Sequence, residues 1–227
     1  MDPHVLDDLG PLYHSYRLFG VENVQLEQFR INQLCKESIL LGYIALAIGK
    51  TREQYFEKPS FVELFCGDGY YTMLAGFLGA SPAVAVDNNR DGWSNDVPEI
   101  ARRLGLPAVR FEQRDVQAIV EHNAYDIVAN LGGLYHVENP VEVLRKSYNL
   151  ARRYLIVQTV VTGANNDPDY YECPAPAQTF GNRYSPQSFV NMVQAEGYRI
   201  LDAEFNHLAG NPRVQDQGSV YMLIQKV

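Results

Sequence analysis

The strongest constraint on the fold is an alternation of short apolar runs with helical segments from residue 61 onward. Runs with the composition of buried strands occupy 61–65, 83–87, 108–113, 125–131 and 153–161. Helical patterns follow them at 70–79, 94–104, near 116–122, 139–150 and 185–197. Five such alternations predict a mostly parallel sheet that helices cover on both faces.

The two ends of the chain add to this α/β pattern. Two further strands, 198–205 and 219–227, flank a Gly/Asn/Pro-rich loop and predict an antiparallel hairpin, which gives seven strands in all. Residues 22–48 have helical spacing, and Gly and Pro interrupt it in 49–60. We therefore expect an N-terminal helical cap over 1–57 and a main domain over 58–227. The long loop 162–184 is interpreted as a lid or a disordered segment.

Composition narrows the class of protein. A chain of 227 residues with 46% hydrophobic residues can form one ordinary domain. Its three cysteines suggest neither a disulfide framework nor a zinc site. The start of the chain has no apolar core of signal-peptide length, and no apolar run approaches the roughly 20 residues that span a bilayer. We expect a cytoplasmic protein without a membrane segment.

The turn after the first strand, "FVELFCGDGYYT", indicates a cofactor site. Gly67 and Gly69 allow a ligand to approach the backbone at the carboxyl end of the strand. A dinucleotide site would have G-x-G-x-x-G, whereas here the third glycine is missing. Asp68 would repel a pyrophosphate, and Glu63 adds a second acid. The sulfonium and ammonium groups of S-adenosylmethionine (SAM) suit these acids better than NAD does.

The ends of the next strands carry polar residues in the order that such a ligand needs. Asp87 can accept hydrogen bonds from both ribose hydroxyls, and Asn88 would lie beside the ribose or adenine. Asp115 can reach the adenine amino group or can cap the following helix. Asn130 and Leu131 would place backbone groups near the methionine ammonium, next to Gly132.

Over roughly residues 58–227 the chain resembles the class I SAM-dependent methyltransferases. "VELFCGDGYYT" is similar to their cofactor loop, with Phe65 at the position of the first glycine, and "AVAVDNN" to their ribose-acid strand. The resemblance implies a Rossmann-like, doubly wound fold. It also implies a cofactor-binding set that comprises Glu63, Phe65, Cys66, Gly67, Asp68, Gly69, Tyr71, Thr72, Asp87, Asn88, Asp115, Val116, Asn130, Leu131 and Gly132. "LYHVENP" is similar to the tRNA wobble-uridine carboxymethyltransferase branch.

Candidate catalytic residues follow the fourth strand. His136 is a candidate general base because imidazole titrates near neutral pH, although it can also cap the next helix. Tyr135 is a second catalytic candidate, or it forms part of the wall of the cofactor site. Aromatic residues expected at the mouth and in the lid are Tyr13, Tyr16, Tyr170, Tyr171 and Tyr184. We predict no metal site, since Asp87, Asp91 and Asp96 lack a ligand pattern.

These features predict transfer of a methyl group from SAM to an oxygen or nitrogen of a small molecule, which leaves S-adenosylhomocysteine (SAH). The net charge of −8 and the scarcity of basic clusters favour a small acceptor over RNA. A tRNA-modifying (carboxy)methyltransferase and a non-catalytic SAM-binding module stay as alternatives. An NAD-dependent oxidoreductase conflicts with Asp68 and the missing glycine. The sequence does not indicate the oligomeric state.

Overall fold

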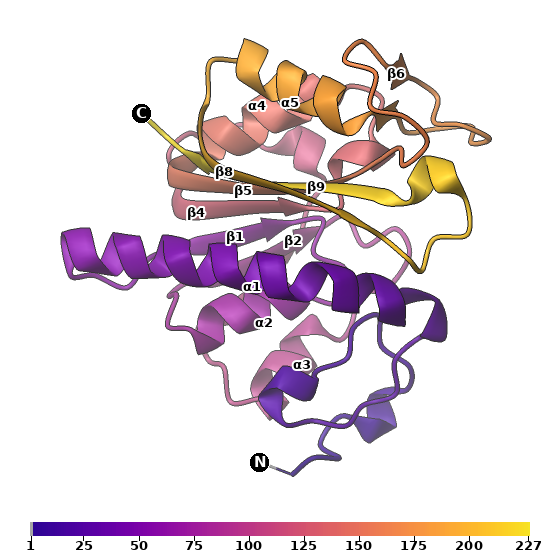
Figure 1. Cartoon of the computed structure of the whole chain (residues 1–227). Helices are drawn as coiled ribbons and strands as arrows, with labels where there is room; N and C mark the ends of the chain where they lie inside the picture. Colours follow the sequence, from indigo (N-terminus) through magenta and orange to yellow (C-terminus); the bar gives the residue numbers. More distant parts are fainter. Residues whose placement is uncertain (1) are drawn as a thin grey trace.

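A seven-stranded sheet runs through the centre of the computed structural model, which describes residues 2–227 (Figure 1). The strands lie in the order β3-β2-β1-β4-β5-β9-β8. Their bounds are β1 (Phe61–Leu64), β2 (Ala83–Asp87), β3 (Val109–Gln113), β4 (Tyr125–Leu131), β5 (Ala151–Val161), β8 (Arg199–His207) and β9 (Gly218–Gln225). The pairs among β1 to β5 are parallel, whereas β9 runs antiparallel to both β5 and β8. The predicted fold class is confirmed.

Helices cover both faces of the sheet. In Figure 1, α4 (Pro140–Leu150) and α5 (Pro186–Ala195) lie above it, and α1 (Glu27–Tyr55), α2 (Tyr70–Phe77) and α3 (Val97–Arg103) lie below it. Successive strand residues point to opposite faces, so Phe61 joins the core under α1 to α3 and Val62 joins the core under α4 and α5. Both faces are buried, which explains why the central strands are apolar throughout.

The first helix is longer than its sequence pattern predicts. The expected break at Gly49 is absent, and α1 continues to Tyr55, where Phe56 adopts a left-handed φ of 58°. A glycine inside a helix costs only about 1 kcal/mol, and burial of Ile48 and Thr51 on either side of it offsets this cost. The prediction that 49–60 is non-helical was therefore wrong as far as Tyr55.

By length and composition alone, α1 is long and apolar enough to cross a membrane, which the sequence pattern did not predict. Core helices of soluble proteins pass the same test, so the absence of a membrane segment stays a prediction. Here Leu40, Ile44 and Ala47 are buried in the core against the sheet.

Two irregular segments flank the carboxyl edge of the sheet. The N-terminal segment, residues 2–26, contains two short 3₁₀ helices, η1 (Asp7–Leu9) and η2 (Arg17–Phe19). The segment 162–184, expected as a lid or disordered, contains a small hairpin of β6 (Tyr171–Glu172) and β7 (Arg183–Tyr184). Further 3₁₀ turns are η3 (Val116–Ala118), η4 (Leu134–His136) and η5 (Val214–Asp216).

Candidate active site

A cavity of about 300 Å³ opens at the carboxyl edge of the parallel strands. It lies where the strand order reverses between β1 and β4, which is the place where open α/β sheets bind ligands. Most of the residues predicted for the site line it. They are Glu63, Phe65, Cys66, Gly67, Tyr71, Asp87, Asn88, Asp115, Val116, Leu131, Gly132, Tyr135 and His136, together with Tyr13 from the N-terminal segment.

The loop between β1 and α2 holds a strained phenylalanine. Phe65 has a φ of 61°, a conformation that glycine adopts freely and that bulky residues rarely do. Its ring packs against Gly133, where a Cβ atom would lie only 1.9 Å from the ring. The absence of a side chain at Gly133 therefore makes room for Phe65, and the loop keeps a glycine-like backbone at this position.

Glu63 is a buried carboxyl group at the floor of the cavity. Its Oε2 accepts hydrogen bonds from the backbone N–H of Thr72 at 2.7 Å and from the Thr72 hydroxyl at 2.6 Å. Burial nevertheless raises the pKa of Glu63 to about 8, and the nearby charges of Asp68 and Asp87 act in the same direction. A positively charged ligand in the cavity would favour its ionised form.

Asp87 ends β2 with its carboxylate on the cavity. It accepts hydrogen bonds from the backbone N–H of Asn89 at 2.7 Å and of Gly67 at 3.4 Å. Burial raises its pKa, and these two bonds oppose that rise. Asp115 lies farther along the same edge and caps η3, since its Oδ1 accepts from the backbone N–H of Gln117 at 2.7 Å. Asp115 therefore caps the following helix and also lines the cavity, and its contact with the adenine amino group stays a prediction.

Asp68 has a different place from that expected of a cofactor contact. It does not line the cavity, and its carboxylate is occupied by His14 from the N-terminal segment. The backbone carbonyl of Asp68 accepts from the Tyr16 hydroxyl at 2.9 Å. All three side chains are buried, so the loop and the N-terminal segment form one packed unit. His14, for which the sequence offered no partner, lines the cavity beside them.

Tyr135 and His136 lie in η4, which the segment 162–184 holds in place. Asn182 donates to the carbonyl oxygens of Leu134 and Val137, both at 2.7 Å. The guanidinium group of Arg183 lies 5.0 Å from the centre of the Tyr135 ring. Burial and nearby guanidinium groups lower the pKa of His136 to about 4, which favours the neutral imidazole and also weakens it as a base.

The remaining predicted residues lie away from the cavity lining. They are Gly69, which caps α2, Thr72, which bonds Glu63, Asn130, which bonds Ser147, and the tyrosines Tyr16, Tyr170, Tyr171 and Tyr184. The last three belong to the segment 162–184. There Tyr170 donates to Glu172 at 2.8 Å and the Tyr171 ring packs 4.6 Å from that of Tyr184. These contacts stabilise the hairpin of β6 and β7 rather than a wall of the cavity.

Several lining residues were missed from the sequence. Lys36 comes from α1, Gln158 from β5, and Trp93 from the loop after β2. Of these three, Gln158 could have been recognised from the sequence, because it is a polar residue within the apolar run "YLIVQTVV" of a buried strand. Among residues 2–227, no group of three or more His, Cys, Asp and Glu side chains could hold a metal ion.

An unsatisfied polar atom indicates that the cavity suits a polar ligand. The hydroxyl of Tyr71, a residue that lines the cavity, is buried without a hydrogen-bond partner. At Gly67, no atom lies within 4 Å of the position that a Cβ would take, so a ligand can approach the backbone there. Together with the carboxylates of Glu63 and Asp87, these groups fit a nucleoside that also carries a cationic amino-acid portion.

The comparisons with known proteins agree with this geometry. Residues 41–203 match the model of the family described as "Methyltransferase domain". No curated protein matches the sequence. Among solved structures, magnesium protoporphyrin IX methyltransferase from Synechocystis PCC 6803 with bound SAM is 13% identical, with a TM-score of 0.64, covering 93% of this chain and 89% of that one.

Two other solved structures have the same fold. The Burkholderia thailandensis 1,6-didemethyltoxoflavin-N1-methyltransferase, solved with 1,6-didemethyltoxoflavin and SAH, is 16% identical with a TM-score of 0.57, covering 82% of this chain and 78% of that one. The [4+2]-cyclase SpnF is 16% identical with a TM-score of 0.61, covering 80% and 81%. At these identities the likeness concerns the fold alone, whereas the family model spans more than half of the chain. The chain belongs to the methyltransferase domain family.

Proposed function

We propose that this protein is a SAM-dependent methyltransferase that acts on an oxygen or nitrogen atom of a small molecule. The observation that carries the proposal is the cavity at the strand reversal, with the Asp87 carboxylate and the Phe65–Gly67 backbone on its wall. Two of the solved structures similar to this chain are methyltransferases that act on small molecules, and both were solved with SAM or SAH.

The residues of the cavity have complementary roles in this proposal. Asp87 binds the ribose, Asp115 and Val116 border the adenine, and Glu63 faces the methionine ammonium. SAM, when bound, supplies an electrophilic methyl group on a sulfonium. The acceptor atom forms the new bond in line with the bond that breaks, and sulfur keeps the electron pair of the broken bond. Alignment by the cavity walls supplies much of the acceleration.

The proton that the acceptor loses needs a base only if the acceptor is a hydroxyl or a protonated amine. We assign this role to His136, which lines the cavity. Tyr135, whose ring packs 3.9 Å from that of His136, forms part of the same wall. The segment 162–184 would support catalysis indirectly, by holding η4 through Asn182 and Arg183.

The composition of the chain supports the small acceptor and a cytoplasmic location. The net charge is −8, and binding to RNA phosphates generally requires clustered Lys and Arg. The three cysteines are all free, which suits a reducing compartment. A tRNA-modifying enzyme would bind tRNA with strong salt dependence, so a binding assay at low salt distinguishes the two functions.

The first test is a calorimetric titration of the purified protein with SAH and with NAD. Binding of SAH at micromolar concentrations, without binding of NAD, is the expected result. Lack of SAH binding would contradict the proposal, and binding of NAD alone would indicate an oxidoreductase. Incubation with SAM and panels of acceptors, with SAH release as the readout, then separates an enzyme from a non-catalytic SAM-binding module.

A further inference from the structure

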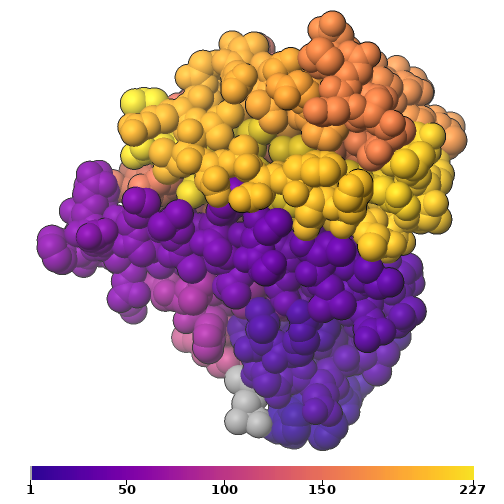
Figure 2. All heavy atoms as spheres, in the orientation of Figure 1, coloured from indigo at the N-terminus to yellow at the C-terminus, as the bar shows by residue number. Residues whose placement is uncertain are grey.

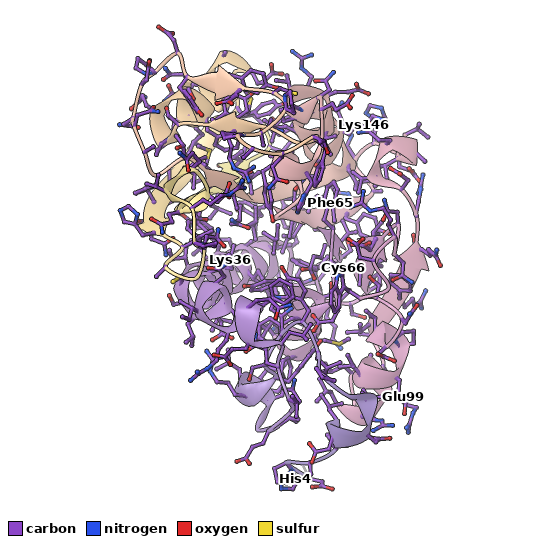
Figure 3. All side chains as sticks on the ribbon, turned by 90° about the vertical axis from the view of Figure 1, so that its right-hand side faces the viewer. His4, Lys36, Phe65, Cys66, Glu99 and Lys146 are labelled. Atoms are coloured by element: carbon purple, nitrogen blue, oxygen red, sulfur yellow. The ribbon has the colours of Figure 1, made fainter. Side chains whose placement is uncertain are left out.

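Lys36 is a charged side chain in the cavity that the proposed methyl transfer does not use. It comes from α1 and lies across the open centre of the molecule from Phe65 and Cys66 (Figure 3). The side chain is half-buried, and burial lowers the pKa of its ammonium group to about 8. No carboxylate within residues 2–227 makes an ion pair or a hydrogen bond with it.

The other charged residues of the cavity already have partners. Glu63 accepts from Thr72, and Asp87 accepts from two backbone N–H groups. Arg90, at the exposed rim, lies 3.4 Å from the carboxylate of Asp91. Lys36 is thus the lining cation whose charge is not balanced by a neighbour. A partly desolvated ammonium is costly, and a ligand that supplies a negative charge would remove this cost.

The charge of Lys36 reaches His136, on the acceptor side of the cavity. Burial lowers the pKa of His136, and the charges of Arg183, Arg90 and Lys36 act in the same direction. Arg183 is paired with Asp216 and Arg90 with Asp91, so among these three cations Lys36 is the one without a carboxylate partner in residues 2–227. An unpaired ammonium does not suit the sulfonium or the ammonium of SAM. It suits an anionic group next to His136, on the side assigned above to the acceptor.

The walls near Lys36 are aromatic. Tyr13 and Trp93 both line the cavity, with their ring centres 5.9 Å apart in an edge-to-face arrangement. Tyr135 and His136 line it from η4. Flat rings pack favourably against such walls, through stacking or edge-to-face contacts. A planar ligand with one negative charge would use both the aromatic walls and the ammonium group.

We propose that the methyl acceptor is an aromatic acid whose carboxylate is bound by Lys36. This inference rests on the proposed function and names its class of substrate. An ion pair with Lys36 withdraws electron density from the carboxylate, so the methyl group goes to another oxygen or nitrogen of the same molecule. His136 is then placed to take the proton of that atom.

The experiment compares a carboxylate with its neutral isostere on the SAH-loaded protein. The probes are 4-hydroxybenzoate and 4-hydroxybenzamide, titrated by ligand-observed NMR. The acid is expected to bind about tenfold or more tightly than the amide, since a hydrogen bond to a charged group contributes roughly 1.5–3 kcal/mol. Equal binding of the two probes, or binding of neither, would overturn the proposal.

Variants of Lys36 test whether this residue causes the preference for the acid over the amide. Lys36→Gln should remove the preference for the acid, whereas Lys36→Arg should keep most of it. Lys50→Gln, an exposed lysine on the same helix, serves as the matched control and should leave the preference intact. An unchanged preference in Lys36→Gln would contradict the assignment. The wild-type comparison stands even if a variant fails to fold.

The carboxylate of the cofactor is the other possible source of the anion, and a second pair of probes distinguishes it. SAH has this carboxylate, and 5′-methylthioadenosine lacks it. If Lys36→Gln weakens the binding of SAH by about tenfold but leaves the binding of 5′-methylthioadenosine unchanged, Lys36 binds the cofactor and the proposal fails. If wild-type protein does not bind SAH at all, the proposed function itself fails, which is a separate outcome.

Discussion

Nδ1 of His14 lies 2.6 Å from one carboxylate oxygen of Asp68, and the backbone N–H of His14 donates to the other oxygen at 2.8 Å. One buried carboxylate therefore binds both the ring and the main chain of a residue 54 positions earlier in the sequence. This pair joins the N-terminal segment to the loop between β1 and α2. It makes that segment a part of the cavity wall.

Asp68→Asn should destabilise the protein, because an amide can accept at only one of its two terminal atoms. We expect the free energy of unfolding, measured in urea, to fall by roughly 1.5–3 kcal/mol, the usual contribution of a hydrogen bond to a charged group. Asp169→Asn, at an exposed position, is the control and should change little. Equal stability of the two variants would show that the His14–Asp68 contact does not hold the segment.

The raised pKa of Glu63 predicts a pH dependence of stability. In the unfolded chain this carboxyl ionises at its usual pKa, and in the folded protein only near pH 8. The contribution of Glu63 to stability is therefore complete below the usual pKa and is lost as the pH rises through about 8. Glu63→Gln has no such ionisation, so its melting temperature should fall less between about pH 5 and pH 8.

The melting temperature without ligand, recorded across this pH range, checks the prediction. Glu112→Gln, at an exposed position of β3, should follow the wild-type curve. Parallel curves for Glu63→Gln and wild type would mean that Glu63 is ionised in the folded protein at neutral pH.

Asp87→Ala should weaken SAH binding by more than tenfold. The ribose would lose two hydrogen bonds to a charged acceptor, each contributing roughly 1.5–3 kcal/mol. Calorimetry measures the effect, and Asp91→Ala, which removes an exposed carboxylate from the rim of the same cavity, is the matched control. Near-normal affinity in Asp87→Ala would contradict the placement of the ribose.

The contact between Phe65 and Gly133 predicts a strong coupling between two substitutions. Gly133→Ala places a Cβ 1.9 Å from the Phe65 ring, so the ring must move. The expected cost is about 1–3 kcal/mol of unfolding free energy, with weaker SAH binding because the loop shifts. In the background of Phe65→Gly the same change should cost much less, because the ring is gone.

A double-mutant cycle in urea measures this coupling. Gly42→Ala, in an open part of α1, is the control and should be neutral or slightly stabilising. Equal costs of Gly133→Ala in both backgrounds would rule out the contact as the reason for the glycine.

Local sequence patterns were sufficient to predict the strands of the central sheet. The bounds of β2 and β4 were predicted to the residue, because each is a short apolar run between polar or glycine-containing turns. The end of α1 was not predicted, since burial around Gly49 outweighs the low helix propensity of glycine. The order of the strands then brought Glu63, Asp87 and Asp115 to one edge, as expected for a parallel sheet.

The parts of the site that the sequence did not predict come from outside the alternating region. Lys36 and His14 reach the cavity only because α1 and the N-terminal segment pack against α2 and the sheet. No local pattern reports such packing. For Asp68 the sequence position suggested a contact with the ligand. The structure instead gives it a protein partner, His14, which no local pattern could predict.

The contact of α1 with the last two strands has a consequence for the order in which the chain folds. Asn206 of β8 donates to the carbonyl oxygen of Cys35 at 2.7 Å, and the Tyr43 hydroxyl donates to Asp202 at 3.1 Å. Figure 2 shows the early and late parts of the chain side by side along this line. Because β9 lies between β5 and β8, the packing of α1 is complete only after both β8 and β9 have joined the sheet. Contacts between segments so far apart in the sequence slow folding, and we expect a chaperone to cover the apolar face of α1 until β8 and β9 have been synthesised.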